Sequence, residues 1–131
     1  MNPFRAAVEA QDLERVVALL DEDVVFRSPV VFKPYHGRDD VAALLRAVFR
    51  VFEDFRYERE IGAVDATDHA LVFRARIGDR EIEGCDFLHT GDDGLIEELV
   101  VMVRPLSGAL ALGEAMKAEL AQGQSGTGAS Q

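Results

Sequence analysis

The chain has 131 residues, of which 48% are hydrophobic, and it carries a formal net charge of −10. One domain of this length buries a substantial core. Because the sequence is acidic and has no run of lysine and arginine interleaved with aromatic residues, it argues against nucleic acid or an anionic membrane as a partner.

The cysteine and histidine residues argue against a disulfide and against a metal site. Cys85 has no second cysteine to pair with, so we expect a reduced structural thiol. His36, His69 and His89 are scattered and lack the spacing of metal ligands, so we expect neither a metal nor a cofactor. No apolar run reaches the roughly 20 residues of a membrane span, and the first residues do not resemble a secretion signal, so a cytoplasmic protein is expected.

Two short helices are predicted at the start of the chain. Pro3 suits the first position of a helix that stops near Gln11, and Asp12 is placed to cap a second helix. Residues 24–26, two valines and a phenylalanine, then predict a strand. The segment 29–34 begins and ends with proline and is typical of a loop folded against a core.

A longer helix and four strands follow. After Gly37, Asp39 or Asp40 is placed to cap a helix. Its apolar residues recur at helical spacing, at Val41, Leu44, Leu45, Val48, Phe49 and Phe52. Strands are predicted over residues 55–64, 69–77, 80–90 and 95–104. Helices followed by a meander indicate an α+β domain.

The end of the chain divides into two parts. A C-terminal helical segment is expected after Pro105, although Gly108 and Gly113 weaken it. Residues 122–131 have no large apolar side chain and are rich in Gly, Ser, Thr and Gln, which is typical of a flexible tail. The sequence therefore predicts a single domain over residues 1–121 and a tail over residues 122–131.

Asp86 is the most informative residue of the strand region. The turn Gly78–Asp79 suits a two-residue hairpin, and the pairing that follows places Asp86 opposite Leu71 on an apolar face of the sheet. Because an isolated buried carboxylate is costly, such a group is usually paired, hydrogen-bonded or protonated. A protonated one donates a hydrogen bond to a ligand oxygen. A purely structural role for Asp86 fits the pattern equally well.

His69 is the second candidate catalytic residue. It shares the inward parity of Asp86 and lies diagonally from it in the predicted pairing. A histidine beside a turn is also commonly solvated, so both interpretations stay open.

Several short segments, taken in order, resemble the nuclear-transport-factor-2-like superfamily, and within it ketosteroid isomerases and SnoaL-like polyketide cyclases. The resemblance covers residues 3–105. It rests on Ala10–Leu13, Val17–Leu20, Asp23–Pro29, Gly37–Asp39, Gly84–Asp86 and Asp93–Ile96. It implies a cone-shaped, curved antiparallel sheet packed on N-terminal helices, with an apolar pocket inside and often a homodimer built on the outer sheet face.

The two faces of such a sheet have different expected roles. The ligand pocket is expected to be lined by Phe4, Ser28, Tyr35, Phe52, Phe55, Tyr57, Leu71, Phe73, Leu88, Leu99, Val101 and Val103. The opposite parity carries the apolar residues of the expected dimer contact, Val72, Cys85, Phe87, Val100 and Met102.

The catalytic pattern of ketosteroid isomerases carries over only in part. The position that resembles their general base is Ser28, and the position that resembles their oxyanion-hole tyrosine is Phe4. Asp86 alone corresponds to a residue of that family's oxyanion hole. A serine without an activating base is a poor proton acceptor, so the sequence argues against a steroid isomerase.

Three functions stay open. The first is a protein that binds a small apolar ligand, with protonated Asp86 donating to one ligand oxygen. The second is an isomerase, cyclase or hydratase acting on a small apolar or polycyclic substrate, with Asp86 as acid/base and help from Tyr35, Tyr57, His36 or His69. The third is a dimeric interaction module with a filled interior. An epoxide hydrolase is disfavoured, because no inward arginine flanked by two inward carboxylates is found.

Overall fold

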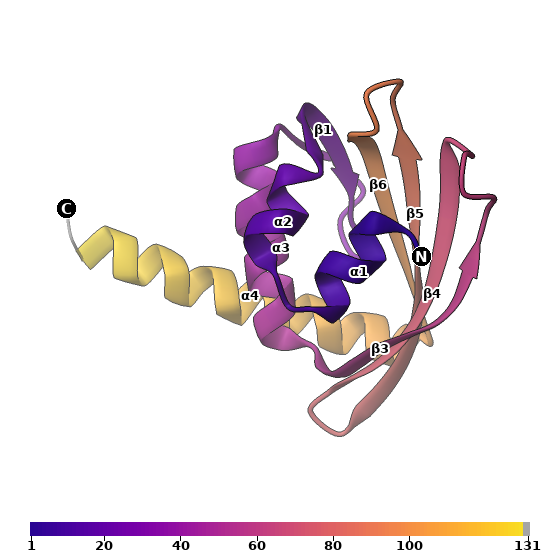
Figure 1. Ribbon diagram of the computed structural model, residues 1–131. Coiled ribbons are helices and arrows are strands. Elements are labelled where there is room, and N and C mark those ends of the chain that lie inside the picture. Colours follow the sequence, from indigo (N-terminus) through magenta and orange to yellow (C-terminus); the bar gives the residue numbers. More distant parts are fainter. Residues whose placement is uncertain (130–131) are drawn as a thin grey trace.

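The computed structural model describes the backbone of residues 1–129 and the side chains of residues 1–122. Two helices, two strands and a third helix come first, and a four-stranded meander and a long helix follow (Figure 1). The elements are α1 (Pro3–Glu9), α2 (Leu13–Ala18), β1 (Leu20–Arg27), β2 (Tyr35–His36), α3 (Arg38–Val51), β3 (Glu53–Ile61), β4 (Asp68–Ile77), β5 (Arg80–Thr90), β6 (Ile96–Arg104) and α4 (Leu106–Ala129). This order confirms the predicted α+β fold.

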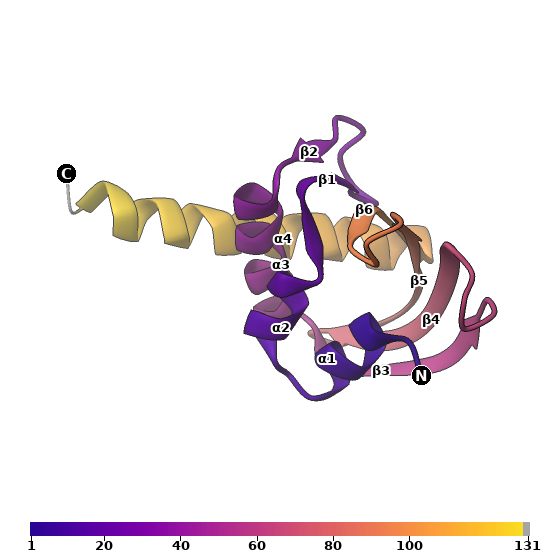
Figure 2. The ribbon, with the colours of Figure 1, turned by 45° about the horizontal axis from the view of Figure 1, so that its top comes forward.

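The strands form one six-stranded sheet in the order β2-β1-β6-β5-β4-β3. All neighbours are antiparallel except β1 and β6, which are parallel. The sheet is curved and does not close on itself, and Figure 2 shows α1, α2 and α3 on its concave side. The interior of the molecule therefore lies between the concave sheet face and these helices.

The predicted hairpin register is confirmed at every position from Ile77 to Leu71. Gly78 has a φ of 60° in the tight turn, and Leu71 pairs with Asp86. On the other side Asp86 pairs with Val101. The concave face consequently carries Asp86 among leucine, valine and phenylalanine side chains.

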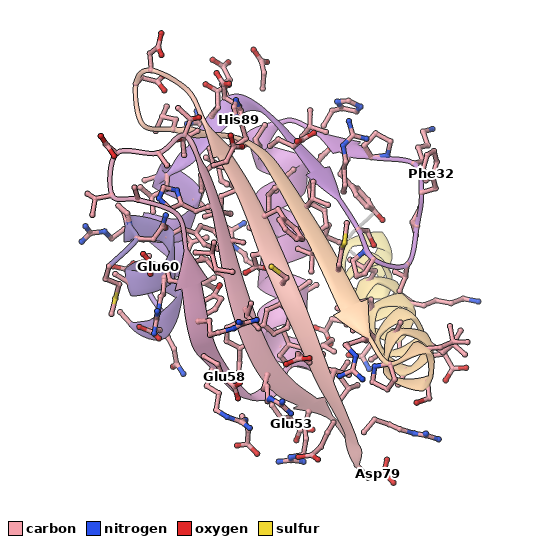
Figure 3. All side chains as sticks on the ribbon, turned by 90° about the vertical axis from the view of Figure 1, so that its right-hand side faces the viewer. Phe32, Glu53, Glu58, Glu60, Asp79 and His89 are labelled. Atoms are coloured by element: carbon pink, nitrogen blue, oxygen red, sulfur yellow. The ribbon has the colours of Figure 1, made fainter. Side chains whose placement is uncertain are left out.

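The residues predicted to lie on the outer sheet face do lie there. Its apolar residues Phe87 and Met102 are 41% and 59% exposed. Figure 3 looks onto this face, with the Asp79 turn at one end of the strands and His89 toward the other. Ion pairs surround the apolar centre, including those that Glu83 makes with Arg74 and Arg104.

Some predicted boundaries were wrong. Neither Asp39 nor Asp40 caps α3, because the cap position is Gly37, with a φ of 93° and no side-chain hydrogen bond; both aspartates lie in the first helical turn. They still favour the helix start through the helix dipole. The segment before α3 also holds the short strand β2, which was not predicted from the sequence.

The C-terminal helix α4 is longer than its two early glycines suggested. A Cβ atom on Gly108 would lie 2.4 Å from Cγ2 of Ile82 on β5, so this glycine allows close packing of α4 on the sheet. The helix continues through residues 122–129, where a flexible tail was predicted, and residues 130–131 lie outside the described part of the chain. Over the part that is described, no helix is both long and apolar enough to cross a membrane.

Candidate functional site

Asp86 and Tyr57 form a buried pair on the concave face of the sheet. The Tyr57 hydroxyl donates a hydrogen bond to Oδ2 of Asp86 over 2.7 Å. Both side chains are only 7% exposed. Of the possibilities open at the start, the structure therefore gives Asp86 a buried tyrosine partner rather than contact with bulk water.

Aromatic packing positions the pair. Tyr57 lies on β3 and Asp86 on β5, and Phe73 of the intervening strand β4 pairs with Tyr57 on one side and Gly84 on the other. A Cβ atom on Gly84 would lie 2.3 Å from Cζ of Phe73, so only glycine leaves room for that ring. The rings of Phe55 and Phe73 stack at 4.8 Å, and Phe55 meets Tyr57 edge-on at 4.9 Å.

The electrostatics of the pair follow from its burial. Desolvation raises the pKa of Asp86 from 3.8 to about 7, even though the hydrogen bond from Tyr57 acts in the opposite direction. Burial, together with the nearby Asp86 charge, raises the pKa of Tyr57 well above its ordinary value. Asp86 therefore changes protonation state near neutral pH, whereas Tyr57 stays a hydrogen-bond donor.

Helix α1 contacts Tyr57 of the pair through the side chain of Arg5. The Arg5 guanidinium lies over the Tyr57 ring, 5.9 Å from its centroid. Arg5 also pairs with Glu9 at 3.2 Å and with Glu60 of β3 at 3.4 Å. The side chain of Asn2 caps α1 by accepting hydrogen bonds from the backbone N–H groups of residues 4 and 5. These contacts fix α1 against β3.

A small apolar cavity of about 50 Å³ adjoins the pair. It is lined by Phe4, Phe26, Pro29, Leu45, Val48, Phe49, Phe52, Phe55, Tyr57, Asp86, Leu99, Val101 and Leu112. Tyr57 and Asp86 contribute the only polar side-chain groups in this lining. A molecule that enters the cavity therefore finds hydrogen-bonding side chains at a single place.

A larger groove of about 570 Å³ shares a wall with the cavity. The residues common to both are Phe26, Pro29, Val48 and Leu112. The remaining lining comes from Ser28, Val30, Val31, Tyr35, Leu44, Gly113, Met116, Lys117, Leu120 and Ala121. This volume falls within the roughly 300–1,000 Å³ that is typical of small-molecule sites.

The structure divides the predicted pocket residues into three groups. Those that line the cavity with Asp86 are Phe4, Phe52, Phe55, Tyr57, Leu99 and Val101. Ser28 and Tyr35 line the groove instead. Leu71, Phe73 and Leu88 are buried in the core, and the half-buried Val103 packs against it, without lining the cavity.

His69 is not brought together with Asp86. Its Nε2 lies 2.8 Å from the carbonyl oxygen of Ala63, in the turn between β3 and β4. His69 is absent from the cavity lining, and His36 is exposed on β2. The geometry thus gives Asp86 a tyrosine partner and no histidine partner.

Tyr57 was predicted as a helper of Asp86, but the direct hydrogen bond between the two was not predicted. Leu112 was not predicted either, because nothing in the sequence says where the C-terminal helix packs. The inward positions of α3 that reach the cavity, Leu45 and Phe49, were predicted only as apolar helix positions. Among the described residues, no group of three or more His, Cys, Asp and Glu side chains is placed to hold a metal ion.

Comparison with known proteins gives a match to one family over most of the chain. Residues 3–99 match the SnoaL-like domain. The crystal structure of a steroid delta-isomerase from Pseudomonas aeruginosa is 43% identical, covers 92% of this chain and 88% of that chain, and has a TM-score of 0.87. No curated protein matches the chain.

Two further solved structures resemble the chain. An uncharacterized bacterial protein with a cystatin-like fold from Silicibacter pomeroyi is 38% identical, covering 90% of this chain and 85% of that chain at a TM-score of 0.83. A SnoaL-like protein of unknown function from Burkholderia thailandensis is 16% identical, covering 79% of this chain and 90% of that chain at a TM-score of 0.63, and it shows the fold alone.

Proposed function

Because the chain belongs to the SnoaL-like domain family, which it matches over most of its length, we propose that it binds a small, mostly apolar molecule through one oxygen atom. The observation that carries this proposal is the Tyr57–Asp86 pair, which supplies the only polar side-chain groups among thirteen lining residues. Apolar sites with a few convergent polar groups are the usual form of small-molecule sites.

The protonation state of Asp86 determines how it contacts the ligand. When Asp86 is neutral, it donates its proton to a ketone or ester oxygen of the ligand while its other oxygen accepts from Tyr57. When Asp86 is ionised, it accepts from a phenol. Because its pKa is raised to about 7, both forms are available near neutral pH.

The cavity beside Asp86 is too small to hold a whole ligand. Its volume of about 50 Å³ is close to the space of one or two water molecules. The groove is more than ten times larger and shares four wall residues with the cavity. We therefore place the ligand oxygen at Asp86 and the ligand body in the groove, with small movements of the shared wall between them.

A thermal-shift titration with 2-naphthol and naphthalene tests this proposal, because a ligand that binds only the folded protein stabilises it. The two probes differ by one hydroxyl group. We expect 2-naphthol to stabilise the wild type more than naphthalene does. Asp86→Asn and Tyr57→Phe should shrink this difference, while Asp92→Asn at an exposed turn serves as the matched control.

Equal stabilisation of all four proteins by 2-naphthol would contradict the proposal, because the oxygen would then bind elsewhere. Absence of binding by any apolar alcohol, phenol or ketone of this size would instead favour the interaction module. A cytoplasmic location stays a prediction from the sequence.

A second candidate function is a double-bond isomerase. It is favoured by the steroid delta-isomerase that is 43% identical to this chain and by the carboxyl group whose pKa is raised to about 7. In this mechanism ionised Asp86 takes a proton from the carbon between a ketone and a double bond, and the enolate oxygen accepts a hydrogen bond from Tyr57. Asp86 then returns the proton to the far carbon of the conjugated system.

The isomerase is tested with a β,γ-unsaturated 3-ketosteroid, whose conversion to the conjugated ketone is followed by ultraviolet absorbance. If the chain is an isomerase, Asp86→Asn removes turnover and Asp92→Asn retains it. Because Ser28 and Phe4 stand at the positions of that family's base and tyrosine, we rank this function second. Ligand binding without turnover would leave the binding function alone.

A further inference from the structure

The apolar groove carries a charge that the proposed function does not use. Fourteen residues line the groove, and Lys117 of α4 is the only charged one among them. The other polar side chains of the lining are Ser28 and Tyr35. The Ser28 hydroxyl already accepts hydrogen bonds from the backbone N–H groups of Val30 and Val31. Lys117 is thus the strongest polar group available to a molecule in the groove.

The charge of Lys117 is unusual in this acidic chain and has no ion-pair partner among the described residues. The protein has a net charge of −10 and only two lysines, Lys33 and Lys117. On α4 the acidic Glu119 is paired with Arg50 of α3. No carboxylate of the described residues lies within ion-pair distance of Lys117. The positive charge at the groove is therefore available to a ligand.

Apart from Lys117, Ser28 and Tyr35, the groove is apolar, and exposed hydrophobic residues form part of its border. The loop after β1 contributes Val30 and Val31, which are 41% and 44% exposed, and it continues to Phe32, which is 99% exposed. Figure 3 shows Phe32 at the edge of the molecule, on the same side as α4. Apolar side chains left in water in this way are typical of a site that a hydrophobic molecule covers.

These observations define the chemistry of the occupant. We propose that the groove selects an apolar molecule that carries a carboxylate, with its hydrocarbon part against α3, α4 and the 28–35 loop and its carboxylate paired with Lys117. Lys117 adds no electrostatic attraction for a neutral hydrocarbon, and it repels a ligand that carries a positive charge. The inference deepens the proposed function, because it assigns the ligand at Asp86 an acidic group at its other end.

Isothermal titration with decanoate and its neutral analogue decanamide tests the proposal. The two probes share a hydrocarbon chain and differ in charge. We expect decanoate to bind more tightly, and we expect Lys117→Gln to weaken decanoate binding about two- to fivefold while leaving decanamide unchanged, because Lys117 is exposed and exposed ion pairs contribute little. Lys117→Arg should restore most of the affinity. Arg80→Gln removes an exposed positive charge at the turn between β4 and β5, outside the groove lining; it is the matched control and should bind decanoate like the wild type.

A second variant tests the location independently of charge. Gly113 lines the groove, and a Cβ atom there would make an ordinary contact of 3.4 Å with Val30 Cγ1. Gly113→Leu places further carbon atoms in the groove, and it suits a helix better than glycine does. We expect this variant to fold and to lose binding of both probes. Unchanged decanoate affinity in Gly113→Leu or in Lys117→Gln would overturn the proposal.

The outcomes separate this inference from the proposed function. If decanoate binding depends on Lys117 but 2-naphthol binding does not depend on Asp86, the groove site stands and the oxygen site at Asp86 fails. If 2-naphthol depends on Asp86 while decanoate and decanamide bind equally, the oxygen site stands and the carboxylate preference fails.

Discussion

The hydroxyl group of Tyr57 reaches the carboxyl group of Asp86 across an intervening strand. Tyr57 is on β3 and Asp86 is on β5, with β4 between them, yet the two oxygen atoms are 2.7 Å apart. The curvature of the sheet, visible in Figure 2, brings side chains of non-neighbouring strands toward one centre. The side-chain hydrogen bond therefore links β3 and β5, which share no backbone hydrogen bonds.

The raised pKa of Asp86 predicts an unusual dependence of stability on pH. The folded state binds this proton more tightly than the unfolded state, so the contribution of Asp86 to stability is fully present below pH 3.8 and is lost as pH rises through about 7. The difference between 3.8 and about 7 corresponds to about 4 kcal/mol, as an upper figure. Asp86→Asn removes this dependence.

Urea denaturation of both proteins between pH 4 and pH 8 measures this effect. We expect Asp86→Asn to be close to the wild type in free energy of unfolding at about pH 4 and more stable than the wild type at about pH 8. Taking the difference between variants cancels the titration of other groups. Asp92→Asn should track the wild type throughout. A constant difference between Asp86→Asn and the wild type would refute the raised pKa.

Tyr57→Phe should destabilise the protein more at high pH than at low pH. Without the hydroxyl donor, a neutral Asp86 loses one hydrogen bond, at a cost of about 1 kcal/mol, whereas an ionised Asp86 loses about 2–3 kcal/mol. The same change should raise the pKa of Asp86 further, because the hydrogen bond from Tyr57 lowers it. The denaturation series described above provides the measurement.

The matched control is Tyr35→Phe, which alters the only other tyrosine of the chain. No hydrogen bond of the Tyr35 hydroxyl is found among the described residues, so its removal should change stability little at any pH. A similar pH profile for both variants would show that Tyr57 does not act through Asp86.

Gly84→Ala should damage the aromatic support of the site. Its Cβ atom would lie 2.3 Å from Cζ of Phe73 and 2.8 Å from the backbone oxygen of Met102, so both the ring and β6 would have to move. We expect a loss of about 1–3 kcal/mol in the free energy of unfolding, together with weaker 2-naphthol binding. Gly91→Ala is the control, because its Cβ would meet the outer end of the exposed Glu97 side chain. Equal stability of both variants would contradict the close packing of Phe73.

The outer sheet face predicts self-association. Phe87 and Met102 are exposed there beside the half-buried Val72, Cys85 and Val100, and a second copy of the chain would cover all five. Light scattering at micromolar concentration should give the mass of two chains. Met102→Glu should give the mass of one chain, whereas Val64→Glu, at a 97% exposed position in the turn between β3 and β4, should not. A wild-type monomer would refute the homodimer.

The register of the β4–β5 hairpin was predictable because a single local feature determines it. Once Gly78–Asp79 is recognised as a two-residue turn, every later pair follows from the alternation of side chains. That is why the burial of Asp86 opposite Leu71 could be derived from the sequence. The curved sheet as a whole came instead from the resemblance to a known superfamily.

The partner of Asp86 was harder to predict, because β3 is irregular. Its pairing with β4 shifts between Glu53 and Arg56 and again between Tyr57 and Arg59. Simple alternation therefore fails along this strand. The hydrogen bond between Tyr57 and Asp86 also depends on curvature, which no local pattern in the sequence encodes.

The glycines of α4 show a different limit of sequence-based reasoning. Intrinsic propensity treats Gly108 as a weakness of the helix. In the folded protein the same residue allows α4 to approach Ile82, which a larger side chain would prevent. Tertiary packing outweighs propensity here, and only the structure reveals that Leu112 consequently reaches the cavity beside Asp86.

Leu112 also gives helix α4 a part in shaping the space proposed for a ligand. It belongs to the wall shared by cavity and groove, yet it lies beyond residues 3–99, the part that matches the SnoaL-like domain. The chemistry at Asp86 and the size of the space beside it are thus encoded in separate stretches of the chain. Substitutions in α4 can change which molecules fit without altering the sheet that holds the carboxyl group.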